Sequence, residues 1–126
     1  MHRYRVFGLF VDAPMAEAAE SVAFWSAALH AEPQVEEGDD AYTRLDGALA
    51  GLVMEVQAVD DQPRYHIDIE TDDVEAEALR LIRLGATVVA RPTGWYVLRA
   101  PGGHLLCVVR VQSDPGFFAA NSREVE

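Results

Sequence analysis

RYHIDIETDDVEAEALRLIRLGATVV (residues 64–89) decides the fold, because it contains a strand, a helix and a second strand in immediate succession. Apolar and polar residues alternate over 65–70, which is the period-two pattern of a β-strand. From Val74 to Ile82 the apolar residues recur at helical spacing. Gly85 follows, at a position suited to the left-handed residue that ends many helices. The stretch therefore predicts a β-α-β unit.

The acidic residues between the strand and the helix of this stretch predict how the helix begins. We expect Asp72 to cap the helix, with Glu75 at the third helical position. Glu77 and Arg80 are three residues apart, and we expect them to lie on the solvent side of the helix. On the strand, Tyr65, Ile67 and Ile69 are expected to pack on the helices.

Three further strands are predicted downstream, with PGG at 101–103 as a tight turn between the last two. They are ATVVARP (86–92), WYVLRAP (95–101) and HLLCVVRV (104–111).

The first half of the chain repeats this order of elements. RVFGLFV (5–11) is a predicted strand, and Pro14 is expected to open a helix at its first position. That helix continues through 16–29, with Phe24 and Trp25 expected in the core. His30 then stands where Gly85 stands in the second half. Shorter strands follow in PQVEEG (33–38), AYTRLDG (41–47) and LVMEVQAV (52–59).

Both halves therefore predict β-α-β-β-β, and such an internal repeat outweighs any single-residue signal. We expect an α+β fold in which two pseudo-symmetric βαβββ modules form a cleft. The expected organisation is one domain over 1–126, with module 1 at about 3–59, a linker at 60–64, module 2 at about 65–111 and a tail at 112–126.

Composition excludes several classes of protein. The net charge of −11 argues against a nucleic-acid partner, which needs a basic surface. It would favour a cationic ligand, but its plainer interpretation is a surface that keeps the protein in solution. No apolar run approaches the roughly 20 residues of a membrane span. The N-terminal apolar stretch is too short for a signal peptide, and Cys107 is the single cysteine. We expect a cytoplasmic protein.

The paired pattern resembles the glyoxalase/bleomycin-resistance/extradiol-dioxygenase group, the vicinal oxygen chelate superfamily, and within it the small glyoxalase-like domain proteins of bacteria. The segments that carry the resemblance are FVDAP, AFWSAALHAEP, HIDIETDDVEAEALRLIRLGA and GWYVLRAPGGHLLCVV. The resemblance covers nearly the whole chain up to about Val111.

Metal-dependent members of this superfamily take one ligand from the first strand and one from the last strand of each half. His66 matches one such position, and Glu55 matches another. Gln57, two residues further along the same strand, is the alternative residue for the second position. Cys107 stands where a glutamate is expected, and Gly8 or a neighbour stands where a histidine or glutamine is expected. With two of four ligands matched, we expect no firmly bound metal. A divalent metal (Zn, Ni, Mn or Fe), if bound, would be held by Glu55, His66 and Cys107.

Each candidate residue has a plainer interpretation. His66 can be a simple hydrogen-bond donor, Glu55 a solvated edge residue, and Cys107 a buried apolar residue. Asp68 shares the face of His66, and Trp95 could stack on a planar ligand. His66 and Asp68 with a later His104 imitate the two-histidine, one-carboxylate iron site. We reject that interpretation because those folds are all-β barrels without a helix in each half.

Three functions remain, and we favour a small-molecule-binding protein with an incomplete metal site. Its ligand site would comprise Glu55, Gln57, His66, Asp68, Trp95 and Cys107. The resemblance implies that such a protein could be a homodimer that sequesters a cationic antibiotic. The alternative is a metal-dependent lyase, isomerase or dioxygenase of the vicinal oxygen chelate type. A metal-free enzyme with Glu55 and His66 as the catalytic acid-base pair is the third.

Overall fold

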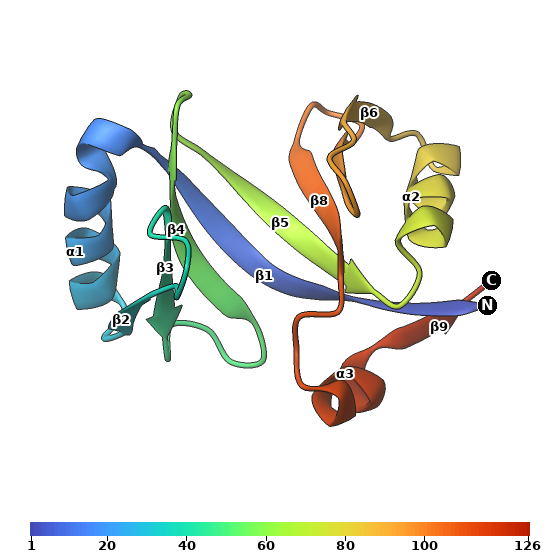
Figure 1. Ribbon diagram of the computed structural model, residues 1–126, viewed down its shortest axis with the longest axis horizontal. Coiled ribbons are helices and arrows are strands. Elements are labelled where there is room, and N and C mark those ends of the chain that lie inside the picture. Colours follow the sequence, from blue (N-terminus) through green and yellow to red (C-terminus); the bar gives the residue numbers. More distant parts are fainter. The chain divides into compact units, whose positions relative to one another are not determined.

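The computed structural model describes residues 1–126 and shows a mixed α+β fold, as predicted (Figure 1). Its elements in chain order are β1 (His2–Pro14), a 3₁₀ turn (Met15–Glu17), α1 (Ala18–Ala28), β2 (Glu32–Val35), β3 (Tyr42–Asp46), β4 (Val53–Val59), β5 (Arg64–Thr71), α2 (Val74–Arg83), β6 (Thr87–Ala90), β7 (Tyr96–Arg99), β8 (Leu105–Arg110), α3 (Pro115–Asn121) and β9 (Arg123–Val125). None of the helices is long and apolar enough to cross a membrane.

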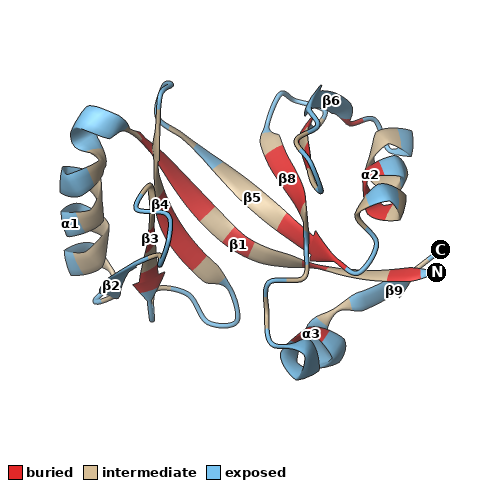
Figure 2. Cartoon of the chain, viewed as in Figure 1, coloured by how far each residue is buried: buried red, intermediate tan, exposed pale blue.

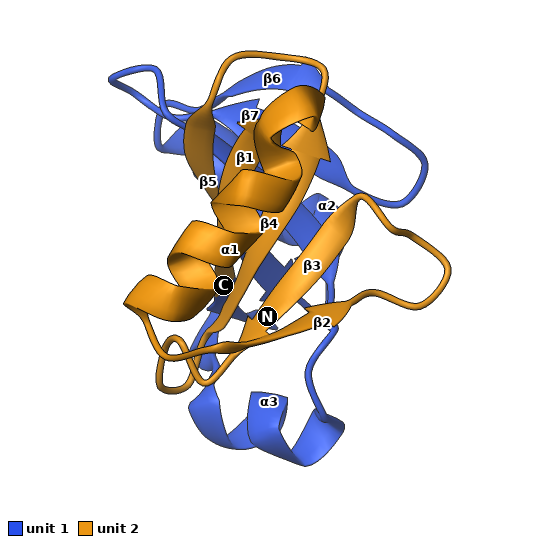
Figure 3. Cartoon of the chain, turned by 90° about the vertical axis from the view of Figure 1, so that its left-hand side faces the viewer, with its two compact units in different colours: residues 1–7, 67–126 blue, residues 8–66 orange.

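The chain divides into two compact units (Figure 3). Unit 1 contains residues 1–7 and 67–126, and unit 2 contains residues 8–66. Strands β1 and β5 contribute to both units, because the boundary passes through β1 after Phe7 and through β5 after His66.

Unit 2 holds four strands in the order β2-β3-β4-β1. β1 and β4 are parallel, while β3 is antiparallel to both β2 and β4. One face of this sheet is apolar, and Val22 and Trp25 of α1 pack against it. The buried residues of that face are Val11, Ala13, Leu45, Met54 and Val56. Figure 2 shows buried residues gathered along β1 and β4.

Gly8 allows β1 and β4 to approach closely. It pairs with Val53 in the parallel register, and a Cβ atom on Gly8 would lie 2.5 Å from the Val53 carbonyl oxygen. No side chain fits at that distance, so this position requires glycine.

Two predictions for α1 are wrong. Pro14 does not occupy the first helical position, because it ends β1 with an extended ψ of 140° and a 3₁₀ turn separates it from the helix. Phe24 is not in the core but 62% exposed, since the apolar face of the unit 2 sheet is covered by the opposite side of α1. The expected equivalence of His30 and Gly85 is confirmed, because both have positive φ, 52° and 116°.

Unit 1 holds strands in the order β5-β8-β7-β6. β5 and β8 are parallel, and β7 is antiparallel to β8 and to β6. The first residues of β1 pair with β9 in the same unit. α2 packs on this sheet through Ala78, which is 1% exposed. Its buried strand partners are Ile69, Tyr96, Leu98, Leu106 and Val108.

The predicted cap of α2 is displaced by one residue. Asp73 is the cap, and its carboxylate accepts a hydrogen bond from the Ala76 amide at 3.0 Å. The Asp72 carboxylate instead accepts a hydrogen bond from the Arg3 amide of β1 at 2.8 Å, so it binds this strand and does not cap the helix.

Two predictions about solvent exposure in the opening stretch are wrong. Glu77 is fully buried, because it accepts hydrogen bonds from His2 at 2.7 Å and from Arg80 at 2.8 and 2.7 Å. Glu70, for which no exposure was predicted, is also fully buried. Tyr65, expected to pack on the helices, is 59% exposed.

The C-terminal tail is held in unit 1 by the buried carboxylate of Glu70. This carboxylate accepts hydrogen bonds from Arg5 (2.7 Å), from the Ser113 hydroxyl (2.6 Å) and from the amides of Gln112 and Ser113 (2.7 and 3.0 Å). Beyond this point α3 buries Phe118, which is 6% exposed. Glu70 therefore joins the first strand, the fifth strand and the tail.

Candidate functional site

Strand β5 places two of the predicted site residues on one face. His66 and Asp68 are two residues apart, so strand alternation directs both side chains to the same side. The intervening Ile67 packs against the core cluster of unit 1 on the other side. The apolar-polar alternation seen in the sequence therefore fixes which way the histidine and the carboxylate point.

Strand β8 adds the third residue. Its parallel register pairs Cys107 with Asp68, which puts the thiol on the same face as the carboxylate. Leu106 and Val108, on either side of Cys107, belong to the core cluster and hold the strand in place. Cys107 itself is 9% exposed.

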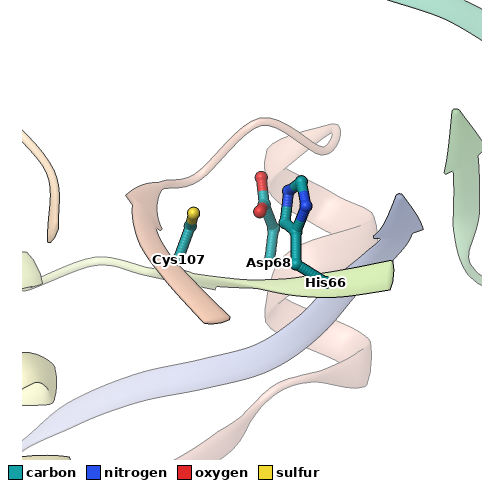
Figure 4. A group of neighbouring side chains, drawn as sticks. All are labelled: His66, Asp68 and Cys107. Carbon is teal, nitrogen blue, oxygen red and sulfur yellow. The ribbon is translucent and has the colours of Figure 1, made fainter. Parts of the chain in front are cut away.

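The three side chains converge (Figure 4). An imidazole nitrogen of His66, a carboxylate oxygen of Asp68 and the Sγ of Cys107 all lie within 4.8 Å of one another. A ring nitrogen, a carboxylate oxygen and a sulfur are all ligands that transition metals accept. We call these residues the His66–Asp68–Cys107 group.

Asp12 of β1 orients the imidazole of His66. Its Oδ2 lies 2.9 Å from His66 Nδ1 and also accepts a hydrogen bond from Arg64 Nε at 2.9 Å. The Asp12 side chain is 1% exposed, so this contact is shielded from water. A carboxylate at Nδ1 favours the tautomer with the proton on Nδ1, which leaves Nε2 as the nitrogen able to coordinate.

The ring of His66 is also held by an aromatic contact. Phe10 stacks on it with centroids 4.7 Å apart and the planes at 12°. Tyr42 in turn meets Phe10 edge to face at 6.3 Å. The imidazole thus has a fixed plane as well as a fixed tautomer.

Glu55 and Gln57 lie on β4 of unit 2, on the face opposite the apolar core. In the register of β1 and β4, Phe10 pairs with Glu55 and Asp12 with Gln57, so these four residues share one face. Glu55 is 7% exposed on a strand flanked by β1 and β3. Burial excludes the interpretation of Glu55 as a solvated edge residue.

Trp95 is half-buried and lies just before β7, which begins at Tyr96. The strand therefore begins one residue later than predicted, and Trp95 lies outside it, so strand alternation does not fix the direction of its side chain. His104 lies between the turn and β8, outside the His66–Asp68–Cys107 group.

Asp12 is the residue that sequence reasoning missed. The sequence contained one indication of its role: Asp12 stands between Val11 and Ala13 at the end of a predicted strand, and a buried carboxylate there needs a hydrogen-bonding or charged partner. That partner, His66, lies 54 positions away in the sequence, and local patterns do not reveal such a pairing.

The fold resembles that of several solved structures. It is similar to methylmalonyl-CoA epimerase from Mycobacterium tuberculosis, with a TM-score of 0.60 and 16% identity over 90% of this chain and 91% of that one. It is also similar to the hypothetical protein BH1468 from Bacillus halodurans, with a TM-score of 0.64 and 12% identity over 88% of this chain and 98% of that one. At these identities the likeness shows the fold alone.

A third solved structure with this fold contains a metal. The Mn(II)-bound glyoxalase from Novosphingobium aromaticivorans matches with a TM-score of 0.59 and 17% identity over 91% of this chain and 44% of that one. No curated protein matches the chain. Residues 8–109 match the family model of the glyoxalase-like domain, and the chain therefore belongs to this family, within the vicinal oxygen chelate superfamily.

Proposed function

We propose that the protein binds a small oxygen-bearing molecule at the His66–Asp68–Cys107 group, through a divalent metal ion of the zinc class held by these three side chains. The observation that carries the proposal is the convergence of their three donor atoms within 4.8 Å. Donors bound to tetrahedral zinc at about 2.0–2.3 Å lie roughly 3.3–3.8 Å apart, so small side-chain rotations suffice.

The donor set suits this metal. Three protein ligands with a fourth position open to a substrate are the arrangement of catalytic zinc sites. A thiolate among the ligands favours zinc over the harder cations such as magnesium and calcium. The contact between Asp12 and His66 Nδ1 supports the proposal further, because metal-binding histidines commonly use their second nitrogen in this way.

This proposal differs from the expectation drawn from the sequence. The sequence comparison counted only the family's ligand positions, where Glu55 and His66 match. Strand geometry adds Asp68, which the resemblance did not imply as a ligand, and brings Cys107 beside it. The Mn(II)-bound glyoxalase of the same fold supports the proposal, because it shows that a protein of this fold can hold a divalent metal.

When bound, the metal would supply a Lewis acid that polarises a carbonyl oxygen of the ligand. The chain's own residues would hold and orient it: Asp12 fixes the tautomer of His66, and Phe10 fixes the plane of its ring. Glu55 is our candidate for moving a proton, since a buried carboxylate on a strand has a fixed direction. The reaction class would then be that of a lyase or isomerase.

The test is calorimetric titration of the metal-stripped protein with zinc, then nickel, manganese and iron(II). We expect one-to-one zinc binding that His66→Ala, Asp68→Asn and Cys107→Ser each weaken at least tenfold. His104→Ala is the matched control, because His104 lies outside the group, and it should bind as the wild type does. With cobalt(II), a thiolate charge-transfer band that Cys107→Ser abolishes would identify the sulfur ligand. Absence of binding by all four metals would refute the metal site.

A second function is favoured by the net charge of −11. In this case the protein would bind a cationic small molecule without metal, as a sequestering protein and as a homodimer. Metal-stripped protein would then bind cationic antibiotics, and added zinc would not change their affinity. Sedimentation velocity would test the dimer.

A further inference from the structure

The outer side of helix α2 exposes a leucine between two opposite charges. Glu75, Leu79 and Arg83 follow one another at intervals of four residues, so their side chains form one stripe along the helix, and all three are exposed. Leu79 is 47% exposed, whereas Ala78 on the inner side packs on the core of unit 1. Figure 2 shows buried, intermediate and exposed residues along α2. The helix therefore has an apolar side chain that unit 1 leaves in contact with solvent.

A groove of about 370 Å³ lies beside this stripe. It is lined by Asp73, Glu75, Ala76, Leu79, Ile82 and Tyr96. The Glu75 carboxylate already has two partners within unit 1, because it accepts hydrogen bonds from Arg91 at 2.8 Å and from the Tyr96 hydroxyl at 2.7 Å. Helices pack by placing the side chains of one into the grooves of the other. α2 thus has both parts of such a contact, an exposed leucine and a groove with an apolar lining.

The charges of α2 are complementary to those of a second α2 that runs in the opposite direction. The acidic residues Glu75 and Glu77 lie in its first turn, and Arg80 and Arg83 lie in its last turn. Glu75 and Arg83 are each four residues from Leu79. About a two-fold axis at Leu79, Glu75 of each copy therefore faces Arg83 of the other. Glu75 can accept this further hydrogen bond, because each carboxylate oxygen has two lone pairs.

Helix α1 lacks this pattern, although it also exposes a large apolar residue. Phe24 is 62% exposed, but Glu20 is the single charged residue of α1, and its last turn contains no basic residue. The surrounding charge differs as well. Unit 2 contains twelve acidic residues and two arginines, whereas unit 1 contains nine acidic residues and eight arginines. A second copy of this acidic chain is therefore repelled much less by unit 1 than by unit 2.

We propose that the outer side of α2 is the interface of a homodimer, in which two α2 helices pack antiparallel and Leu79 of each copy enters the groove of the other. The two-fold contact uses the same surface on both copies, so the assembly closes at two chains. A helix of ten residues is only about 15 Å long, so the contact is smaller than the roughly 800 Å² per partner of a standard interface. We therefore expect a weak dimer that depends on concentration. The interface requires neither a metal nor a ligand.

Sedimentation equilibrium of the metal-stripped full chain, from about 10 to about 500 μM, tests the association. We expect the average mass to rise from 13.9 kDa towards twice that value. Leu79→Ala should weaken association at least about tenfold, the scale of a central interface residue. Phe24→Ala is the matched control on α1 and should associate as the wild type does. A monomer at every concentration, or a dimer that Leu79→Ala leaves unchanged, would overturn the proposal.

Charge reversal tests the antiparallel arrangement separately from stability. Glu75→Arg places two cations opposite each other in the dimer, and Arg83→Glu places two anions opposite each other, so each variant alone should remain monomeric. An equimolar mixture of the two variants restores both opposite-charge contacts and should form a heterodimer. Because both residues are exposed, circular dichroism should show that each variant is folded. A mixture that associates no better than its separate components would refute the antiparallel pairing.

Discussion

Replacing Glu70 by glutamine should destabilise unit 1 strongly, because this one carboxylate accepts four hydrogen bonds. One oxygen receives the two amides of Gln112 and Ser113, and the other receives Arg5 and the Ser113 hydroxyl. In Glu70→Gln the side-chain amide oxygen can still accept the hydrogen bonds from the amides of Gln112 and Ser113. The amide nitrogen then faces the guanidinium of Arg5, which is 9% exposed, as donor against donor.

The magnitude follows from the loss of a buried charge partner. Removing one member of a buried ion pair costs about 3–5 kcal/mol, and we expect the lower value because glutamine keeps one acceptor. For a chain of this length about 3 kcal/mol corresponds to a fall in melting temperature of about 10 °C. Thermal and urea unfolding followed by circular dichroism measure both quantities. Glu124→Gln is the matched control, because Glu124 is exposed and 4.0 Å from Arg3, and it should cost less than about 0.5 kcal/mol.

The effect should also depend on pH. Burial acts to raise the pKa of Glu70, but hydrogen bonds from Ser113, Arg5 and Gln112 outweigh it and hold the pKa below its ordinary value of 4.5. The stabilisation is therefore complete above pH 4.5 and is lost as the pH falls through the lowered pKa. The difference in the free energy of unfolding between the wild type and Glu70→Gln should become smaller below pH 4.5. A loss under about 1 kcal/mol at neutral pH, or a difference that stays constant in acid, would refute this reasoning.

Three further predictions concern the backbone and the metal site. Gly8→Ala should lower the free energy of unfolding by about 2–3 kcal/mol, because its Cβ would meet the Val53 carbonyl, and unchanged urea unfolding would contradict this. His30→Gly should raise the free energy of unfolding by about 0.5–1 kcal/mol, since φ is 52°, and a lower melting temperature would argue against strain there. Asp12→Asn should weaken zinc binding about 10–100-fold in calorimetry through loss of His66 orientation, whereas unaltered affinity would show that Asp12 does not orient the ligand.

Local patterns predicted the strand and the helix of the opening stretch, but they predicted no element in the tail, where the structure has α3 and β9. The alternation over 65–70 and the helical spacing from Val74 to Ile82 correspond to β5 and α2, because each pattern reports which face of an element is buried. The match of His30 with Gly85 followed from their equal place after a helix, and both adopt the positive φ that such a place requires.

Burial of the acidic residues could not be predicted in this way. Glu77 and Arg80 have the spacing of a surface ion pair, and only the contact with His2, 75 residues away, explains why Glu77 is buried. Glu70 is buried for the same reason, since its partner Arg5 is 65 residues away. Long-range partners reverse the exposure that the local sequence indicates.

The candidate site was predictable in part. Strand alternation placed His66 and Asp68 on one face, and the resemblance singled out Cys107. Their convergence depends on the parallel register of β5 and β8, which pairs Asp68 with Cys107 and has no local signature in the sequence. Asp12 lacked a predicted role because its contact with His66 is equally non-local.

The division of β1 between the two units has a consequence for the order in which the protein folds. Unit 2 is one continuous segment, 8–66, whereas unit 1 needs residues 1–7 together with 67–126. The hydrogen bonds of His2 with Glu77 and of Arg3 with Ser122 span 75 and 119 positions, so both contacts close long loops of the chain. During synthesis from the N-terminus, residues 1–7 are therefore made before residues 67–126 but can be fixed only after them. The edge of this segment stays unpaired and open to other chains until residues 67–126 have followed.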